Sequence, residues 1–412
     1  MSLKCRFCDS KTDYVFADLG MHPPCESYVP PEKNNSMEPF YPLKAYVCPN
    51  CFLVQLDEYI SPEEIFTEYA YFSSYSDDWL AHVKRYSELM IERFQLSDKS
   101  KVVEVASNDG YLLQYFVAKG IPVLGIEPAR NVAKVAIENG IPTEVIFFNH
   151  ETAPGIINKY GKADLIAGNN VLAQVPNLNS FVKGLKLLLN TTGVITIEFP
   201  HLMHLKEENQ FDTIYHEHFC YFSFYSVNEI FKYHELTLFD VEEIPTHGGS
   251  LRIYACHRQD QTKEISNHVT DMLEREKEKG YLDIATYLEF HENVKETKRK
   301  LLEFLIKAKR DNNKIAGYGA PGKGNTLLNY CGIMTDFIDF TVDRNPYKQG
   351  KYLPGSHIPI FSPEKIDQEK PDYVIILPWN FKDEIMRQMN HIRNWGGKFV
   401  IPIPEVKIID DF

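Results

Sequence analysis

Residues 101–128 read KVVEVASNDGYLLQYFVAKGIPVLGIEP, and this stretch decides the fold class. The apolar run 101–106 predicts a buried strand, the small polar residues after it predict a turn, and 111–120 predicts a helix. A second apolar run, 122–128, predicts the next strand. Strand, helix and strand in close succession are typical of a parallel sheet that has helices on its faces.

The same alternation continues toward the C-terminus. Its predicted elements are a strand over 143–148, a strand over 163–171, a helix over 177–190 and a strand over 193–200. The segments 236–244 and 249–257 are joined by a short turn rich in Pro and Gly, and they predict a hairpin at the edge of the sheet. The predicted fold class is therefore α/β, with a central doubly wound sheet that ends in an antiparallel hairpin.

A second α/β unit is predicted farther along the chain. It begins at 314–329 and continues through 337–345 and 372–379. It follows a charged stretch over 263–310, whose charges we interpret as a solvated helix face. With the Cys- and Pro-rich N-terminus, these patterns predict three domains: 1–72, 73–260 and a Rossmann-like unit over 261–412.

The composition is that of a globular protein. Of the 412 residues, 44% are hydrophobic and 25% are charged. The net charge of −13 argues against a nucleic-acid-binding protein, which normally presents a basic face. The N-terminal residues carry charges where a signal peptide needs an apolar segment, and the longest apolar runs are too short to span a bilayer. We expect a cytoplasmic protein that binds neither nucleic acid nor membranes, with a monomer as the default state.

Four cysteines form two CxxC pairs, Cys5 with Cys8 and Cys48 with Cys51. Two such pairs can complete a tetrahedral thiolate shell around Zn²⁺. Two disulfides, or unrelated thiols, are the alternatives, but disulfides are disfavoured in a cytoplasmic protein. Since four thiolates leave no open coordination position, this zinc is expected to be structural.

The turn after the first strand predicts a cofactor site, because ligands of doubly wound sheets bind at the carboxyl ends of the strands. The turn has only one glycine, so it is not the dinucleotide fingerprint. An acidic residue at the end of the second strand can accept hydrogen bonds from both ribose hydroxyls of an adenosyl group. The predicted cofactor-binding residues are Glu104, Ser107, Asn108, Gly110, Glu127, Asn169 and Asn170.

Residues 215–222, YHEHFCYF, gather ionisable and aromatic side chains. The spacing of a zinc protease fails, because the position four residues after His216 is Cys220. If the stretch is extended, His216 and His218 share one face, and a third ligand from elsewhere would complete a metal site. A general base and a pair of ordinary buried histidines remain the other interpretations.

The stretch GYGAPGKG (317–324) spells GxGxxG between a predicted strand and a predicted helix, and Asp343 ends the next strand. Taken alone, this pattern indicates NAD. A glycine-rich turn at a helix N-terminus can equally hold any diphosphate. A relic of the fold without a ligand is the third possibility.

Several motifs together resemble a known family. VEVASNDGYLL, GIEP and GNNVLAQVPN resemble class I S-adenosylmethionine-dependent methyltransferases. With the four cysteines, YAYFSSYSDDWLAH, IEFPHL, DTIYHEHFCYFS, PTHGGSLRIYACH and GYGAPGKGNTLLNY, nearly the whole chain is similar to the nucleotide-sugar C-3-methyltransferases. One departure is Ala106, which stands where many methyltransferases have glycine and which a negative φ would accommodate.

The resemblance implies a cofactor, a substrate and a reaction. The cofactor is S-adenosylmethionine, and the substrate is a nucleotide-diphosphate 4-keto-6-deoxy sugar used in branched deoxysugar biosynthesis, with TDP as the default and GDP or CDP as alternatives. Because the C-4 ketone acidifies the C-3 proton, a base can remove it, and the enolate then takes the methyl group.

The resemblance also assigns residues. It implies that His218 is the base, with Tyr215 and Glu217 contacting the substrate or setting its geometry. Tyr71 is expected near the transferred methyl group, and the glycine turn becomes the nucleotide-sugar site. The remaining predicted substrate contacts are Lys323, Asn325, His247 and Arg252, the last of which could instead cover the sheet edge.

Two rival functions stay open. An NAD-dependent oxidoreductase or epimerase would use the glycine-rich turn, and a zinc-ribbon interaction module would carry an inactive methyltransferase scaffold.

Overall fold

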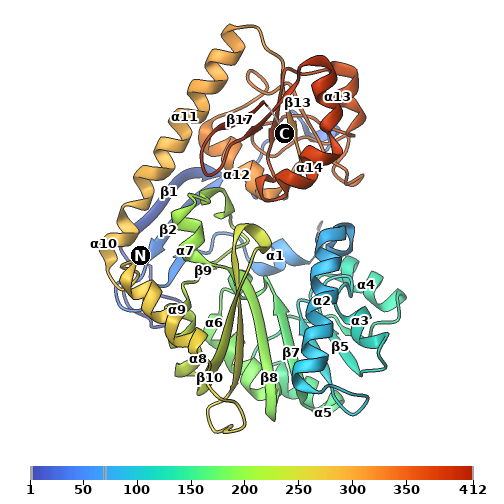
Figure 1. Ribbon diagram of the computed structural model, residues 1–412, viewed down its shortest axis with the longest axis vertical. Coiled ribbons are helices and arrows are strands. Elements are labelled where there is room, and N and C mark those ends of the chain that lie inside the picture. Colours follow the sequence, from blue (N-terminus) through green and yellow to red (C-terminus); the bar gives the residue numbers. More distant parts are fainter. Residues whose placement is uncertain (1–2, 68, 70–71, 411–412) are drawn as a thin grey trace.

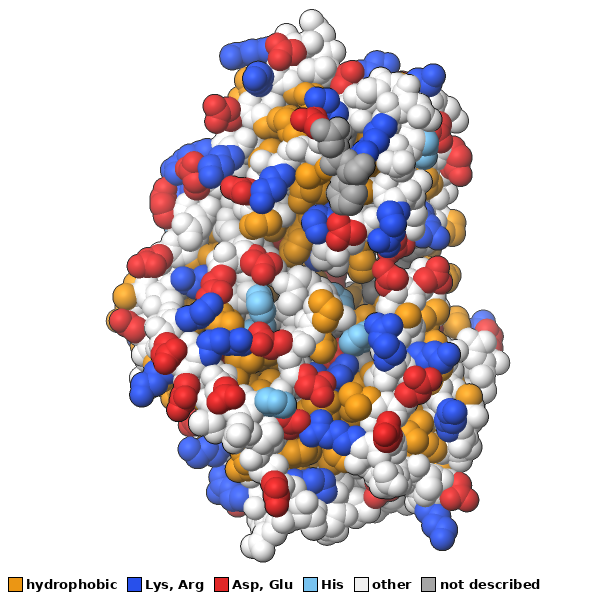
Figure 2. Space-filling view, viewed as in Figure 1, with side chains coloured by type: hydrophobic (Ala, Val, Ile, Leu, Met, Phe, Trp, Pro, Cys, Tyr) orange, Lys and Arg blue, Asp and Glu red, His pale blue; other side chains and the backbone are white. Residues whose placement is uncertain are grey.

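The computed structural model describes residues 3–67, 69 and 72–410. The strands of these described residues form a four-stranded, a seven-stranded and a six-stranded sheet. In Figure 1 the six-stranded sheet lies at one end of the molecule, the seven-stranded sheet at the other, and α11 runs along one side. On the face in Figure 2, acidic and basic side chains are interspersed.

The seven-stranded sheet has the order β10-β11-β8-β7-β4-β5-β6. The strands from β8 to β6 are parallel, whereas β11 and β10 are antiparallel and form the predicted edge hairpin. Their bounds are β4 Val102–Val105, β5 Val123–Ile126, β6 Thr143–Glu144, β7 Ala163–Asn169, β8 Leu189–Pro200, β10 Leu236–Ile244 and β11 Ser250–His257. The predicted strand over 143–148 is thus wrong beyond residue 144.

Helices accompany this sheet, and buried apolar side chains fill both of its faces. The helices are α2 Asp77–Phe94, α3 Leu113–Val117, α4 Arg130–Glu138, α5 Ala153–Tyr160, α6 Leu178–Leu188 and α8 Phe224–Tyr233, whereas α7 Leu202–Glu207 packs in the cluster shared by the N-terminal sheet and the C-terminal unit. Val103 and Val105 of β4 face one cluster while Val102 faces the other, as expected for alternating side chains of a strand with both faces covered. The predicted α/β fold is confirmed.

The N-terminal sheet has the order β1-β2-β3-β9, where β9 comes from the middle of the chain. Its strands are β1 Tyr14–His22, β2 Tyr41–Val47, β3 Val54–Leu56 and β9 Cys220–Tyr221, and α1 Pro62–Phe66 follows β3. Val54 pairs with Tyr221, so the segment directly after His218 is a strand of the zinc-binding part.

The C-terminal sheet has the order β14-β13-β12-β15-β16-β17 and is parallel except for β17. Its elements are β12 Ile315–Tyr318, α12 Gly322–Cys331, β13 Phe340–Val342, β14 Ile360–Phe361, α13 Glu364–Glu369, β15 Tyr373–Ile376, α14 Lys382–Gln388, β16 Lys398–Ile401 and β17 Lys407–Ile409. One hydrophobic cluster runs from this unit into the N-terminal sheet and includes Phe16 and Ile315.

The charged stretch 263–310 forms three helices, α9 Asn267–Glu278, α10 Ile284–Leu288 and α11 Phe290–Arg310. Helix α9 ends before Gly280, which has a φ of +82°. The interpretation of its charges as a solvated face is wrong for Glu276, whose exposed fraction is 0%. Helix α9 lies in the predicted third domain but packs on α8 and β10 of the predicted second domain. The three-domain division stays a prediction.

No helix among the described residues is both long enough and apolar enough to cross a membrane.

Candidate active site

A cavity of about 450 Å³ lies at the carboxyl ends of β4, β5 and β7. Its walls also include residues of the N-terminal part, the 215–218 segment and the C-terminal unit. The predicted site residues that line it are Asn108, Glu127, Asn169, Asn170, Tyr215, Glu217, His218, His247 and Lys323. Predicted site residues that are far apart in the sequence thus line the same cavity.

Glu127 lines the cavity directly after β5. Its carboxylate accepts hydrogen bonds from the backbone N–H of Asn108 at 2.9 Å and of Ala129 at 2.8 Å. Burial raises its pKa to about 7, although the two N–H donors oppose this shift. The turn after β4 and the end of β5 are therefore tied together at the carboxylate that we predicted from the sequence.

Asn169 is the last residue of β7, Asn170 follows it, and the two provide a test of whether the cavity fits a polar ligand. The Oδ1 atoms of both side chains are buried and accept no hydrogen bond from any described residue. Because buried polar atoms are normally paired, two unpaired acceptors on a cavity wall fit a ligand that carries hydroxyl or amino donors. The adenosyl ribose and amino group of S-adenosylmethionine supply such donors, so these residues fit the cofactor.

Three predicted cofactor residues lie behind the cavity wall instead of in it. Glu104 is fully buried, and burial raises its pKa well above the usual range. The Ser107 hydroxyl packs beneath β5, and a Cβ at Gly110 would lie 2.8 Å from Ile141. Gly110 also has a φ of +81°, so its conformation favours glycine. These residues shape the loop and do not face the cavity.

The 215–218 segment is a turn, closed by the His218 N–H donating to the Tyr215 carbonyl at 2.9 Å. The conditional prediction that His216 and His218 share one face of an extended strand is therefore wrong. His218 lines the cavity, whereas His216 Nε2 lies 3.2 Å from the Pro42 carbonyl. The two histidines have separate surroundings, and they do not form a two-histidine metal site.

His218 is a buried, neutral imidazole. Its ring centroid lies 4.2 Å from that of Tyr215. Burial lowers its pKa to about 3, and the neighbouring His247 and Lys323 also lower it, while the backbone of Thr213 opposes them. At neutral pH the imidazole is thus unprotonated and can accept a proton.

Glu217 lines the same cavity in the opposite protonation state. Burial, followed by the nearby Glu26 carboxylate, raises the pKa of Glu217 to about 8. Its carboxyl contacts the Tyr69 hydroxyl at 3.3 Å and the Cys25 thiol at 3.6 Å. At neutral pH it is mainly a carboxylic acid, which can donate a hydrogen bond.

The glycine-rich turn is filled by the N-terminal part of the chain. The Glu26 carboxylate accepts from the Gly322 N–H at 3.1 Å, at the start of α12, and from the Tyr28 hydroxyl at 2.7 Å. A Cβ at Gly322 would lie 2.8 Å from Cys25 Sγ. The close approach of Cys25 therefore explains why position 322 has no side chain. The Glu26 carboxylate already lies at the N-terminus of α12, where a helix can bind an anion.

Two lysines bring positive charge to this end of the cavity. Lys323 Nζ donates to Asn380 Oδ1 at 2.8 Å, and burial lowers its pKa to about 8, while Asp212 opposes the shift. Lys348 Nζ donates to the Ala320 carbonyl at 2.8 Å. Both line the cavity and can face an anionic ligand.

The other predicted substrate contacts have different outcomes. His247 lines the cavity with a φ of +56°, its ring 5.3 Å from that of Trp79, and burial lowers its pKa to about 4. Arg252 is not among the residues that line the cavity, and its guanidinium is paired with Glu198 at 2.6 Å and Glu242 at 2.8 Å. Asn325 is also outside, where its Nδ2 donates to the Cys25 carbonyl at 2.6 Å. Tyr71 lies outside the described residues.

The sequence analysis did not assign five further residues that line the cavity, namely Glu26, Tyr69, Trp79, Lys348 and Asn380. No local pattern reveals the position of Glu26, Lys348 or Asn380. Tyr69 and Trp79 stand within the motif YAYFSSYSDDWLAH that contributed to the resemblance, so a signal for them was present.

The four cysteines of the CxxC pairs converge as predicted. Cys5 Sγ lies 3.5 Å from Cys51 Sγ, Cys8 Sγ lies 3.5 Å from Cys48 Sγ, and all four thiols are free. Tetrahedral Zn–S bonds of about 2.3 Å place sulfurs about 3.8 Å apart, so the set fits zinc and is closed. A second group, His201, His204 and Glu243, has ligand atoms within 4.8 Å, but Arg275 holds Glu243 at 2.6 Å, and we assign no metal there.

Three family models match successive parts of the chain. They are a zinc binding domain over residues 5–66, a methyltransferase domain over 77–241 and a C-methyltransferase C-terminal domain over 245–404. The C-methyltransferase NovU of Streptomyces niveus is 36% identical over 406 residues, which is 98% of this chain and 96% of the relative.

Among solved structures, a SAM-dependent methyltransferase from Anabaena variabilis is 16% identical with a TM-score of 0.36, over 44% of this chain and 87% of that one. Magnesium protoporphyrin IX methyltransferase from Synechocystis is 12% identical with a TM-score of 0.34, over 43% and 79%. The family models and the full-length relative lead to one conclusion. The chain belongs to the C-methyltransferase family, as an S-adenosylmethionine-dependent enzyme with a structural zinc site.

Proposed function

We propose that the enzyme methylates C-3 of a nucleotide-diphosphate 4-keto-6-deoxy sugar, in branched deoxysugar biosynthesis. The observation that carries the proposal is the single cavity that joins the cofactor residues, the neutral His218 and two lysines. A substrate that is both anionic and acidic at carbon matches this combination.

In this proposal His218 is the general base. A carbon atom has no lone pair, so it becomes a nucleophile only after the C-3 proton, acidified by the C-4 ketone, is removed. His218 is unprotonated and lies beside the aromatic ring of Tyr215, which supports this role. A diphosphate anion near Lys323 would offset one of the cations that lower the His218 pKa, and the imidazole would then be a stronger base.

Glu217 and Tyr215 are the proposed donors to the enolate oxygen. Both groups are protonated at neutral pH, because burial raises the pKa of each. A buried carboxylic acid that stays neutral can donate a hydrogen bond to developing negative charge.

Glu127, Asn169 and Asn170 would hold S-adenosylmethionine, which when bound supplies an electrophilic methyl group to the enolate. Lys323 and Lys348 would hold the diphosphate of the substrate. Since Glu26 occupies the N-terminus of α12, we assign the diphosphate to the lysine side chains and not to the glycine turn itself.

The test has two steps. A panel of TDP-, GDP- and CDP-linked 4-keto sugars with isotope-labelled cofactor, followed by mass spectrometry, identifies the substrate. Deuterium exchange at C-3 in heavy water then isolates the proton removal. We expect His218→Asn to lose about 10²- to 10⁴-fold in exchange rate. His216→Asn is the matched control and should keep most of it, since His216 lies outside the cavity.

Retained exchange in His218→Asn would remove this residue from the role of base. Absence of methyl transfer to every sugar of the panel would contradict the substrate assignment. A shift in melting temperature with NAD but not with S-homocysteine would favour the oxidoreductase or epimerase. Turnover accompanied by saturable S-homocysteine binding would exclude the inactive scaffold.

A further inference from the structure

Glu276 is a buried carboxylate on α9, a helix whose sequence is among the most charged in the chain. Its exposed fraction is 0%, whereas Glu274 and Glu278 on the same helix are exposed. A fully buried charge is rare without partners that compensate for the loss of water. The partners of Glu276 therefore indicate what it does.

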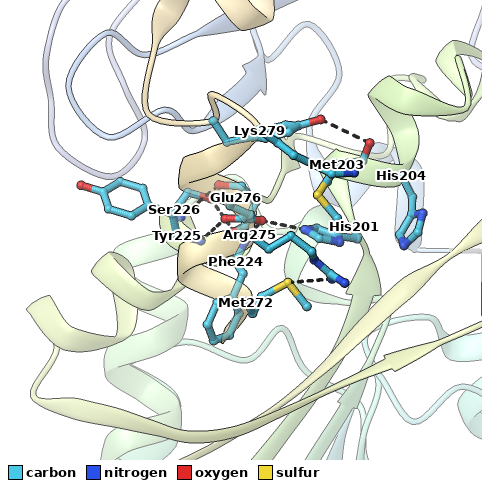
Figure 3. A network of polar contacts seen from close by, with 12 residues as sticks. His201, Met203, His204, Phe224, Tyr225, Ser226, Met272, Arg275, Glu276 and Lys279 are labelled. Carbon is cyan, nitrogen blue, oxygen red and sulfur yellow. Dashed lines mark hydrogen bonds and ion pairs between the residues drawn. The ribbon is translucent and has the colours of Figure 1, made fainter. Parts of the chain in front are cut away.

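Glu276 accepts three short hydrogen bonds (Figure 3). Its Oε1 accepts from the Phe224 N–H at 2.6 Å and contacts His201 Nε2 at 2.7 Å, and its Oε2 accepts from the Tyr225 N–H at 2.7 Å. Phe224 and Tyr225 begin α8, whose first N–H groups have no partner within the helix. A carboxylate at this position satisfies two of these donors and interacts favourably with the helix dipole.

His201 connects this carboxylate to both histidine-bearing segments of the cavity. Its side chain is also fully buried. The backbone N–H of His201 donates to the Gly249 carbonyl at 3.1 Å, and the backbone N–H of the neighbouring Leu202 donates to the Phe222 carbonyl at 2.9 Å. Gly249 is two residues after His247, and Phe222 is four residues after His218. The two segments are thus both hydrogen-bonded to the backbone of His201 and Leu202, and Glu276 of α9 contacts the His201 side chain.

We infer that Glu276 is a positioning residue of the active site, which fixes the segments carrying His218 and His247 by anchoring both the start of α8 and His201. It does not touch the cavity and takes no part in the chemistry. An error of about 1 Å in the position of a reacting group can cost about 10²-fold in rate, so such an anchor matters for turnover. The inference rests on the proposed function, which gives His218 its role as the base.

Two substitutions and one control test the inference. In Glu276→Gln the side-chain NH₂ group must face one of the two backbone N–H donors, Phe224 or Tyr225. The glutamine therefore cannot accept all three hydrogen bonds that the glutamate accepts. Glu276→Asp keeps the charge on a shorter side chain and should rescue part of the function. Glu278→Gln changes an exposed carboxylate on the same helix and should behave as wild type.

The first measurement needs no substrate. Amide hydrogen exchange of the peptides that cover 213–226, well below the melting temperature of each variant, should be about tenfold faster in Glu276→Gln. Glu276→Asp should be intermediate. Exchange equal to that of wild type in both variants would overturn the inference.

The second measurement separates positioning from mere stabilisation. In Glu276→Gln, kcat should fall about 10- to 100-fold with KM and S-homocysteine affinity within about threefold, and Glu276→Asp should recover part of kcat. Faster exchange with kcat within twofold of wild type would show a purely structural role and overturn the inference. If wild type methylates no sugar of the panel, the proposed function fails, whereas wild-type exchange in both Glu276 variants would overturn the inference whatever the substrate.

Discussion

Ala106 has a φ of +60°, in the left-handed region that favours glycine. The sequence analysis made a negative φ the condition for accommodating alanine here, and this condition is not met. The reason is the tight turn between β4 and the cavity, in which Asn108 and Gly110 also have positive φ values. The alanine therefore carries a strain that glycine would not.

Ala106→Gly should leave the free energy of unfolding unchanged or raise it by up to about 1 kcal/mol, because relief of strain outweighs the entropy of glycine. Ala133→Gly, in the interior of α4, is the control and should lose about 1 kcal/mol. Urea unfolding measures both. A loss for Ala106→Gly as large as that of the control would show that the strain is absent.

Glu217 should make the stability of the protein depend on pH. Its folded-state pKa of about 8 lies above the unfolded value. At any pH between these two pKa values, unfolding therefore releases a proton from Glu217. Its contribution is fully present at low pH and is lost as the pH rises through about 8. The free energy of unfolding should fall by about 1.4 kcal/mol per pH unit from this group over that window.

Glu217→Gln should remove this component when urea unfolding is followed from pH 6.5 to 8. Glu278→Gln, at an exposed position, should keep the wild-type slope. An identical slope in Glu217→Gln and wild type would contradict the raised pKa.

At the scale of elements, the glycine-rich turn before α12 shows how one pattern allows several structures. The spacing GxGxxG, the preceding strand and the following helix are all present. However, Asp343 accepts from the Ala320 N–H at 2.7 Å, and Glu26 occupies the helix terminus. The motif fixes the shape of the turn, but the packing of the N-terminal part decides what fills it.

Gly322→Ala should reduce the free energy of unfolding by about 1–3 kcal/mol, because the new Cβ would lie 2.8 Å from Cys25 Sγ. Gly155→Ala is a suitable control, since it lies in α5 with no atom within 4 Å of the added Cβ, and it should gain up to about 1 kcal/mol. Thermal unfolding distinguishes them. Equal stability of Gly322→Ala and wild type would mean that Cys25 does not approach this turn.

At the scale of the whole molecule, the zinc-binding part contributes directly to the walls of the candidate active site. The zinc-binding part supplies Glu26 to the cavity, and its strand β3 pairs with β9, which directly follows the turn of His218. The residues proposed to hold the cofactor, Glu127, Asn169 and Asn170, lie instead at the ends of β5 and β7 of the seven-stranded sheet.

Removing zinc with a chelator should therefore lower the melting temperature by at least about 5 °C and methyl transfer by at least about tenfold. Binding of S-homocysteine, followed by calorimetry below the melting temperature, should change by less than about threefold. Added Zn²⁺ should restore activity, which serves as the control. Full activity of the zinc-free enzyme would contradict the connection.

Features that depend on near neighbours in the chain could be predicted from the sequence alone. Strand and helix periodicity predicted the central sheet, its edge hairpin and the second α/β unit, because hydrophobic periodicity is a local property. The CxxC spacing predicted the zinc site, and the position of Glu127 after the second strand predicted that it lies at the strand ends. Both predictions depend on turns and strand ends, which are local features of the chain.

Only the tertiary structure decided which side chains face the cavity. Residues 215–218 form a turn, so His218 faces inward and His216 does not. Arg252 is neutralised by Glu198 and Glu242, and Glu276 is buried on a charged helix. Each outcome depends on partners that are distant in the chain, because burial and charge pairing are set by three-dimensional packing, which no local pattern contains.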